Sequence, residues 1–305
     1  MLIARLPAIQ DIVFDQLDMR LPHTIVLGGG GVKAIAHIGA LKVLEEKGYL
    51  KLVRKYVGLS AGSLVAFGMA LGYSLNALKD ICERFDFAVL QEPAPDGFLS
   101  FIDNYGIDTG EKLVSFLKAL LTIKGFSSDL TFGSLKSAAS LAVVASNLST
   151  GQPVLFSAET TPNCRLVDAL RSSMSLPFYF WPVHMEDGLH VDGGVHGLYP
   201  MNLLTEDEQR NALGIILLQT IDTWNKFDGP DSYILRLYEI TSHSKSILLY
   251  ERFKENTICI NTPPISSIKF GLSPDERKQL FDAGSNAVNV YISNHKTHIK
   301  RRASI

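Results

Sequence analysis

Short apolar runs alternate along the chain with longer amphipathic stretches, a pattern typical of an α/β fold. The run Thr24–Leu27 predicts a buried strand, and residues 34–47, with apolar positions three and four apart, predict a helix that ends at Gly48. Residues 52–57 predict the next strand. A strand, helix and strand of this length form a crossover that makes two neighbouring parallel strands.

The same two patterns continue to the end of the chain. Residues 90–109, with several prolines and glycines, predict a long irregular connection. The helix expected at 110–124 has one apolar stripe, which we expect to pack in the core rather than face a membrane. Further strands are predicted at 141–146, 154–157, 183–185, 189–191, 212–218 and 257–261, and further helices at 63–70, 75–87, 168–175, 233–254 and 274–293.

Composition narrows the class of protein. The chain has 305 residues, 46% of them hydrophobic and 20% charged, which is ordinary for a globular protein with a large core. A formal net charge of −2 gives no reason to expect nucleic acid as a partner. Three widely spaced cysteines predict reduced thiols in a cytoplasmic protein, and neither a signal peptide nor a membrane-spanning segment is expected.

Two glycine-containing turns follow the first two predicted strands. The first is Gly28–Lys33 and the second is Gly58–Gly62, with Ser60 at its centre. Because the C-terminal ends of neighbouring parallel strands lie on one edge of a sheet, the two turns should face each other across a crevice.

Ser60 has glycine at both second neighbours, Gly58 and Gly62. A sharp turn from strand into helix needs this arrangement, because a side chain at either position would clash as the backbone doubles back. The hydroxyl is then presented at the tip, beside the free N–H groups that begin the helix. A Gly-x-Ser-x-Gly pattern also arises by chance, but its place between strand and helix favours a catalytic nucleophile.

The first glycine turn allows three interpretations. A phosphate-binding P-loop is excluded, because Val32 and Ala34 flank Lys33 where glycine and Ser or Thr are required. A dinucleotide site lacks the acidic residue expected about 20 positions later, so no cofactor is expected. The third interpretation is an oxyanion hole. Its donors would be the backbone amides of Gly29, Gly30, Gly31 and Val32, with Lys33 holding the loop or a phosphate.

A nucleophilic serine needs a base, and the residues leave two kinds open. A Ser-His-Asp arrangement would take its histidine from His196, His243, His295 or His298. The other candidate is Asp192, which lies between an apolar strand and the pair Gly193-Gly194. A carboxylate is a weak base for an alcohol, so a Ser-Asp pair requires a dry site in which oxyanion donors supply much of the stabilisation.

Three motifs in this order, the glycine turn, the Ser60 turn and Asp192-Gly193-Gly194, resemble the patatin-like phospholipase family, which includes the catalytic domain of cytosolic phospholipase A. Residues 145–151 and 171–180 resemble further segments of that family, and the resemblance covers residues 22–205. One departure is Ala34, where the family usually has glycine. The methyl group is tolerated if residue 34 has helical backbone angles and strains the loop if positive φ is needed.

The resemblance implies a three-layer α/β/α fold with a mainly parallel central sheet and C-terminal helices. It also implies a Ser60–Asp192 dyad without histidine, an oxyanion hole from the glycine turn, and hydrolysis of fatty-acyl esters of lipids, phospholipids among them, without a metal. The expected function is a phospholipase A or lysophospholipase type of esterase in peripheral contact with membranes. A non-catalytic lipid-binding relative and a Ser-His-Asp esterase remain as alternatives.

For domain organisation, we expect an N-terminal extension at 1–21, a catalytic core at 22–205, and a C-terminal strand and helices at 206–305 packed on the same domain. The basic tail at 295–305 is either a solvated end or a contact for anionic lipid. The remaining histidines, His37, His184 and His190, lack the spacing of a metal site and are expected to be structural.

Overall fold

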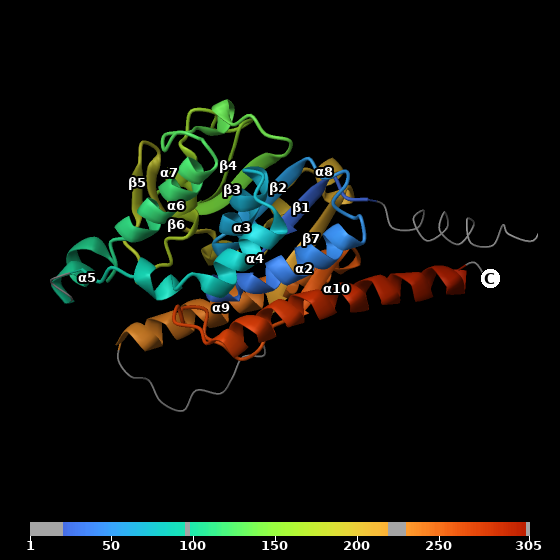
Figure 1. Cartoon of the computed structure of the whole chain (residues 1–305). Coiled ribbons are helices and arrows are strands. Elements are labelled where there is room, and N and C mark those ends of the chain that lie inside the picture. The colour runs from blue at the N-terminus through green and yellow to red at the C-terminus, as the bar shows by residue number, and fades with distance from the viewer. Residues whose placement is uncertain (1–20, 95–97, 219–229, 303–305) are drawn as a thin grey trace, which may run out of the picture.

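Eight strands form one mixed sheet in the computed structural model, which describes residues 21–94, 98–218 and 230–302 (Figure 1). The spatial order is β5-β6-β3-β2-β1-β7-β8. The remaining strand, β4, pairs with β3 and is not part of this linear order. The five strands from β3 to β8 in this order are parallel, which confirms the predicted α/β class. The strands are β1 (Thr24–Leu27), β2 (Lys55–Leu59), β3 (Ser140–Asn147), β4 (Gln152–Ser157), β5 (Val183–Met185), β6 (Gly188–Asp192), β7 (Ala212–Leu218) and β8 (Thr257–Asn261).

Helices follow most of the predicted stretches. A helix also occupies part of 90–109, so the prediction of a wholly irregular connection there was wrong; the prolines and glycines of this segment lie outside residues 98–104, which can therefore form a short helix. The helices are α2 (Ile35–Glu46), α3 (Ala61–Ala70), α4 (Leu75–Arg84), α5 (Phe98–Asn104), α6 (Glu111–Ile123), α7 (Leu166–Ser173), α8 (Glu206–Arg210), α9 (Pro230–Phe253) and α10 (Pro274–Arg302).

Alternate residues of a strand point to opposite faces of the sheet. Because all four residues of β1 are buried, both faces of the sheet are covered there. On one face, Ile25 and Leu27 pack in a cluster with residues of α2, α3, α6, α7 and α10. On the other face, Val26 and Val57 pack with the segment around Tyr199 and with the C-terminal part of α9. Helix α10 lies along α2 (Figure 1). The predicted apolar stripe of α6 is buried in the first cluster, so the prediction of core packing is confirmed.

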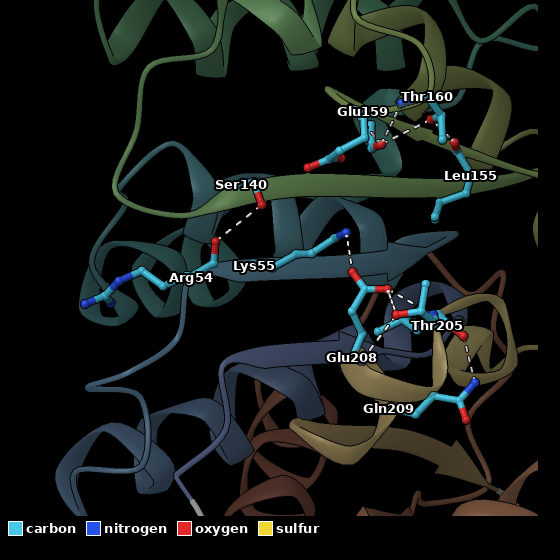
Figure 2. A network of polar contacts seen from close by, with 11 residues as sticks. Arg54, Lys55, Ser140, Leu155, Glu159, Thr160, Thr205, Glu208 and Gln209 are labelled. Carbon is cyan, nitrogen blue, oxygen red and sulfur yellow. Dashed lines mark hydrogen bonds and ion pairs between the residues drawn. The ribbon is translucent and has the colours of Figure 1, made fainter.

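A polar network lies at the edge where the parallel strands begin (Figure 2). Lys55, the first residue of β2, makes a 2.9 Å ion pair with Glu208 of α8. Glu208 also accepts a hydrogen bond from the amide of Thr205, and the two residues form a capping box at the start of α8. This network holds α8 against the sheet, although Lys55 and Glu208 are 153 residues apart in the sequence.

Some predictions lie outside the described residues. These are the extension at 1–20 and the side chains of the basic tail from 296 onward. In the described part of the chain, no helix is both long enough and apolar enough to cross a bilayer.

Candidate active site

The pairing register of β3 brings Ser60 and Asp192 together. One edge of β3 is occupied by β4, and β2 and β6 share the other edge. β2 pairs up to Leu59, opposite Val144, whereas antiparallel β6 ends with Asp192 opposite Ala145. The two strands therefore point their C-terminal ends at each other. Ser60 directly follows β2, so Ser60 and Asp192 lie next to each other beside Val144 and Ala145 of β3.

Ser60 occupies a sharp turn with an unusual backbone conformation. Its φ of 54° and ψ of −131° lie in a region that residues other than glycine rarely adopt. The amide of Ser60 donates a 2.9 Å hydrogen bond to Oγ of Ser173, and that hydroxyl donates a 2.6 Å bond to the carbonyl of Val144 in β3. Helix α7 thus holds the strained turn in place.

Gly62 has no room for a side chain. A Cβ there would lie 2.4 Å from the carbonyl oxygen of Gly28, in the facing glycine turn. At Gly58 a Cβ would lie 2.4 Å from Cα of Ser63 in the first turn of α3. The two predicted supporting glycines therefore allow the close approach of the two turns and the reversal at Ser60.

Asp192 is 2% exposed and lies close to the side chain of Ser60, which favours the charged form of its carboxyl. The amide of Gly194 donates a 2.8 Å hydrogen bond to Oδ1 of Asp192. The amide of Asp192 donates a 2.8 Å hydrogen bond to the carbonyl of Ser175, just after α7. Burial raises the pKa of the Asp192 carboxyl to about 6, although Ser60, the amide of Gly194 and the hydroxyl of Tyr238 favour its charged form. A carboxylate with this pKa is largely ionised at neutral pH and is a stronger base than an exposed one.

The neighbouring Gly193 is buried against Leu59, beside the turn that carries Ser60. Both glycines of the Asp192-Gly193-Gly194 motif thus lie next to Ser60 or Asp192.

Two of the four predicted oxyanion donors are already used by the protein. The amide of Gly29 donates to the carbonyl of Leu198 at 2.9 Å, and the amide of Val32 donates to the carbonyl of Ser267 at 3.0 Å. These bonds fix the glycine turn from both sides. They also remove both amides from the set of donors that a substrate oxygen could use.

The amides of Gly30 and Gly31 make no hydrogen bond within the described ranges of the chain, and both residues line the same cavity as Ser60. Gly31 has a φ of +58°, which glycine adopts without strain. Lys33 is 8% exposed and also lines this cavity. Ala34 has φ −58° and ψ −15°, which are helical angles, so its methyl group does not strain the turn.

A cavity of about 430 Å³ is lined by Ser60 and Asp192 among other residues. Helices α3, α4 and α6 line it with apolar side chains that include Leu64, Leu78, Leu113 and Phe116. Charged and polar side chains line another part, contributed by the glycine turn and α9: Lys33, Arg236, Glu239 and His243. A small reactive polar centre in a mainly apolar cavity is typical of a site for an amphipathic ligand.

A sequence model of patatin-like phospholipases matches residues 25–204, which is more than half of the chain. The chain belongs to the patatin-like phospholipase family. Protein R571 of Acanthamoeba polyphaga mimivirus is 26% identical over 279 residues, covering 88% of this chain and 93% of that protein. The cGAMP-activated phospholipase of Vibrio cholerae is 27% identical over 191 residues, covering 55% of this chain and 52% of that protein.

The fold of this patatin-like protein is also similar to that of VipD from Legionella pneumophila. The two structures superpose with a TM-score of 0.61 at 18% identity, over 90% of this chain and 67% of VipD. At this identity the similarity bears on the fold alone, and it agrees with the α/β/α arrangement described above.

Two residues of this patatin-like site were not predicted as parts of it. Ser173 lies in the segment that resembles the family, but nothing in its spacing indicated a bond to the amide of Ser60. Tyr238 of α9 donates a 3.4 Å hydrogen bond to Oδ1 of Asp192 and comes from a segment beyond the matched region. Only packing brings it to the site, so no local sequence signal could have identified it.

The histidines fall into separate environments. His37 is fully buried, its Nε2 is 2.8 Å from the carbonyl oxygen of Gly28, and burial lowers its pKa to about 4, so it supports the glycine turn as a neutral ring. His190 is buried against Phe156, with Nε2 3.4 Å from a carboxylate oxygen of Asp187. In the described ranges, no group of three or more His, Cys, Asp or Glu side chains is arranged to hold a metal ion.

Proposed function

We propose that this protein is a serine lipid acyl hydrolase that uses Ser60 as nucleophile and Asp192 as base. The observation that carries the proposal is that the pairing register of β3 brings Ser60 next to the buried Asp192 carboxyl and that both residues line one mainly apolar cavity. Membership of the patatin-like phospholipase family and similarity to a phospholipase of Vibrio cholerae support an ester of a fatty acid as substrate.

In the proposed acylation step, the carboxylate of Asp192 accepts the proton of Ser60 while the serine oxygen bonds to the acyl carbonyl carbon. The carbonyl oxygen becomes an oxyanion, which the amides of Gly30 and Gly31 stabilise. The bond to the alcohol then breaks, and the alcohol leaves with the proton from Asp192. Each oxyanion donor of this kind is typically worth roughly 10²–10³ in rate.

In the proposed deacylation step, Asp192 accepts a proton from a water molecule, whose oxygen attacks the acyl carbonyl carbon. The bond to Ser60 breaks, the serine oxygen regains the proton, and the fatty acid leaves. The dyad needs neither a metal nor a cofactor for these steps.

The cavity supports the choice of substrate class. Its apolar part suits a fatty-acyl chain, because burying methylene groups there is favourable by about 0.8 kcal/mol each. Lys33 and Arg236 on its polar part suit the phosphate of a phospholipid head group. The proposed activity is therefore of the phospholipase A or lysophospholipase type, at a membrane surface that the protein contacts peripherally.

The test compares hydrolysis of phosphatidylcholine vesicles and of a fluorogenic fatty-acyl ester by the folded wild type, Ser60→Ala and Asp192→Asn. Both substitutions should reduce the rate at least about 10³-fold, as expected for parts of one catalytic unit. Ser140→Ala, at the opposite edge of the sheet, is the matched control and should keep wild-type activity. Undiminished hydrolysis by Ser60→Ala would refute the proposal.

His243 is the histidine to test as an alternative base, because it lines the same cavity as Ser60. Burial and then the charge of Lys33 lower its pKa, which leaves it neutral at pH 7. The described residues show no hydrogen bond between His243 and Ser60. We expect His243→Ala to retain activity; its loss, together with survival of activity in Asp192→Asn, would assign the base to histidine.

A further inference from the structure

Helix α9 is fastened to the loop that follows Asp192 by side chains one helical turn apart. The hydroxyl of Tyr238 donates to Oδ1 of Asp192 at 3.4 Å, and the hydroxyl of Ser242 donates to the carbonyl of Gly194 at 2.9 Å. One turn later, Ser246 accepts a 2.9 Å bond from the amide of Leu198. Ser242 and Ser246 are each 1% exposed. These contacts place a single polar face of α9 on the segment that carries the base.

Gly194 provides a second observation that joins α9 to the base. A Cβ at this position would lie 2.1 Å from the hydroxyl oxygen of Tyr238. The second glycine of the Asp192-Gly193-Gly194 motif therefore leaves the space in which this hydroxyl sits. A residue inside the region that matches the family is thus fitted to a side chain outside it.

We infer that Tyr238 is a positioning residue that fixes the orientation of the Asp192 carboxylate through its hydroxyl. This inference rests on the proposed function of Asp192 as base. Oδ1 receives two donors, the amide of Gly194 at 2.8 Å and the phenol at 3.4 Å. Two donors from different directions restrict rotation of the carboxylate, so that it stays aimed at the hydroxyl of Ser60.

The phenol remains a donor at every pH at which the enzyme would work. Burial, and next the charge of Asp192, raise the pKa of Tyr238 well above its usual value. In turn, its hydrogen bond favours the charged form of Asp192 and lowers the pKa of that carboxyl. The other titratable or charged side chains of the described residues that line this cavity are Lys33, Tyr73, Cys82, Tyr179, Arg236, Glu239 and His243, and Arg171 lies on α7.

Tyr238→Phe tests the inference, because it removes the hydroxyl and keeps the ring. We expect kcat for ester hydrolysis to fall about tenfold with little change in KM, since a hydrogen bond to a charged group is lost. The acid limb of the pH profile of kcat/KM should move to higher pH, because the carboxylate loses a donor that favours its charge. Tyr250→Phe, the same change on α9 away from the cavity, is the matched control and should leave both quantities unchanged.

Wild-type kcat and an unmoved acid limb in Tyr238→Phe would overturn the inference. A loss of thermal stability without a shift of the acid limb would also overturn it, because it would indicate a structural role alone. If Tyr238→Phe does not fold, Ser242→Ala decides, and we expect a smaller fall in kcat there; an unchanged kcat would again count against positioning by α9. Failure of the proposed function is distinguished by Ser60→Ala, which would then be as active as the wild type.

Discussion

A carboxyl group near the N-terminal ends of the parallel strands has a lowered pKa, whereas one near their C-terminal ends has a raised pKa. Where the strands begin, Glu208 is partly exposed and paired with Lys55 (Figure 2). Burial alone would raise its pKa, but hydrogen bonds from Lys55 and Thr205 outweigh that effect and lower it. Where the strands end, Asp192 is buried with neutral donors only, and its pKa is raised to about 6. The first carboxylate stabilises the fold, whereas the second is kept basic at a cost in stability.

The difference follows from the topology. Crossover connections place successive turns at the C-terminal edge, so the Ser60 turn, the glycine turn and the end of β6 converge there. The opposite edge receives the short α8 and the ends of loops, whose polar groups pair with each other and with solvent. The residues proposed to be catalytic thus lie where the backbone is strained and the carboxylate is desolvated.

The largest effect should come from filling the space between the two turns at the C-terminal edge. Gly62→Ala would force a Cβ to within 2.4 Å of the Gly28 carbonyl oxygen, and neither backbone can yield without moving a strand. We expect the free energy of unfolding in urea to fall by more than about 3 kcal/mol, or the protein not to fold. Gly271→Ala, where an added Cβ meets nothing within 4 Å, is the control. Equal stability of the two variants would contradict this packing.

Asp192→Asn should stabilise the protein while removing its activity. The pKa of this carboxyl is raised in the folded state, so ionising it destabilises the fold as pH rises from about 4 to 6. An amide carries no charge, accepts from Gly194 and donates to Ser60. Thermal and urea unfolding at pH 8 should therefore show a gain of up to about 3 kcal/mol, which disappears near pH 4. The same stability as the wild type at both pH values would argue against a desolvated carboxylate.

The smallest effect is expected at the opposite edge, with the opposite sign. The pKa of Glu208 is lowered in the folded state, so its contribution is present above the ordinary carboxyl pKa and is lost as pH falls through the lowered value. Glu208→Gln should cost about 0.2–1 kcal/mol at pH 8 and almost nothing at pH 3, with catalytic activity unchanged. A gain in stability at pH 8, as in Asp192→Asn, would erase the contrast between the two edges.

Much of the fold could be predicted from local patterns. The first strand was predicted with the bounds that the structure shows, and the serine turn falls between β2 and α3 as its glycines indicated. Local patterns could not show α5, because proline and glycine around it predicted irregular backbone.

The candidate site was harder to predict, because its details depend on contacts between distant segments. The residues alone left the base open between Asp192 and a histidine, and only the family resemblance favoured the dyad. The amides of Gly29 and Val32 donate hydrogen bonds to the carbonyls of Leu198 and Ser267, which lie much later in the chain, so the sequence could not show that these amides are occupied. The contacts of Ser173 with Ser60 and of Tyr238 with Asp192 span 113 and 46 residues, so no periodicity along the chain reveals them.

The most direct measurement is covalent labelling of the wild type, Ser60→Ala and Asp192→Asn with a fluorophosphonate probe, followed by intact mass and peptide mapping. An activated serine should give a single adduct, located on the peptide that contains Ser60, and Asp192→Asn should label far more slowly although it is folded. An adduct on a different residue, no adduct on the folded wild type, or undiminished labelling of Asp192→Asn would contradict the claim that Asp192 activates Ser60 for attack.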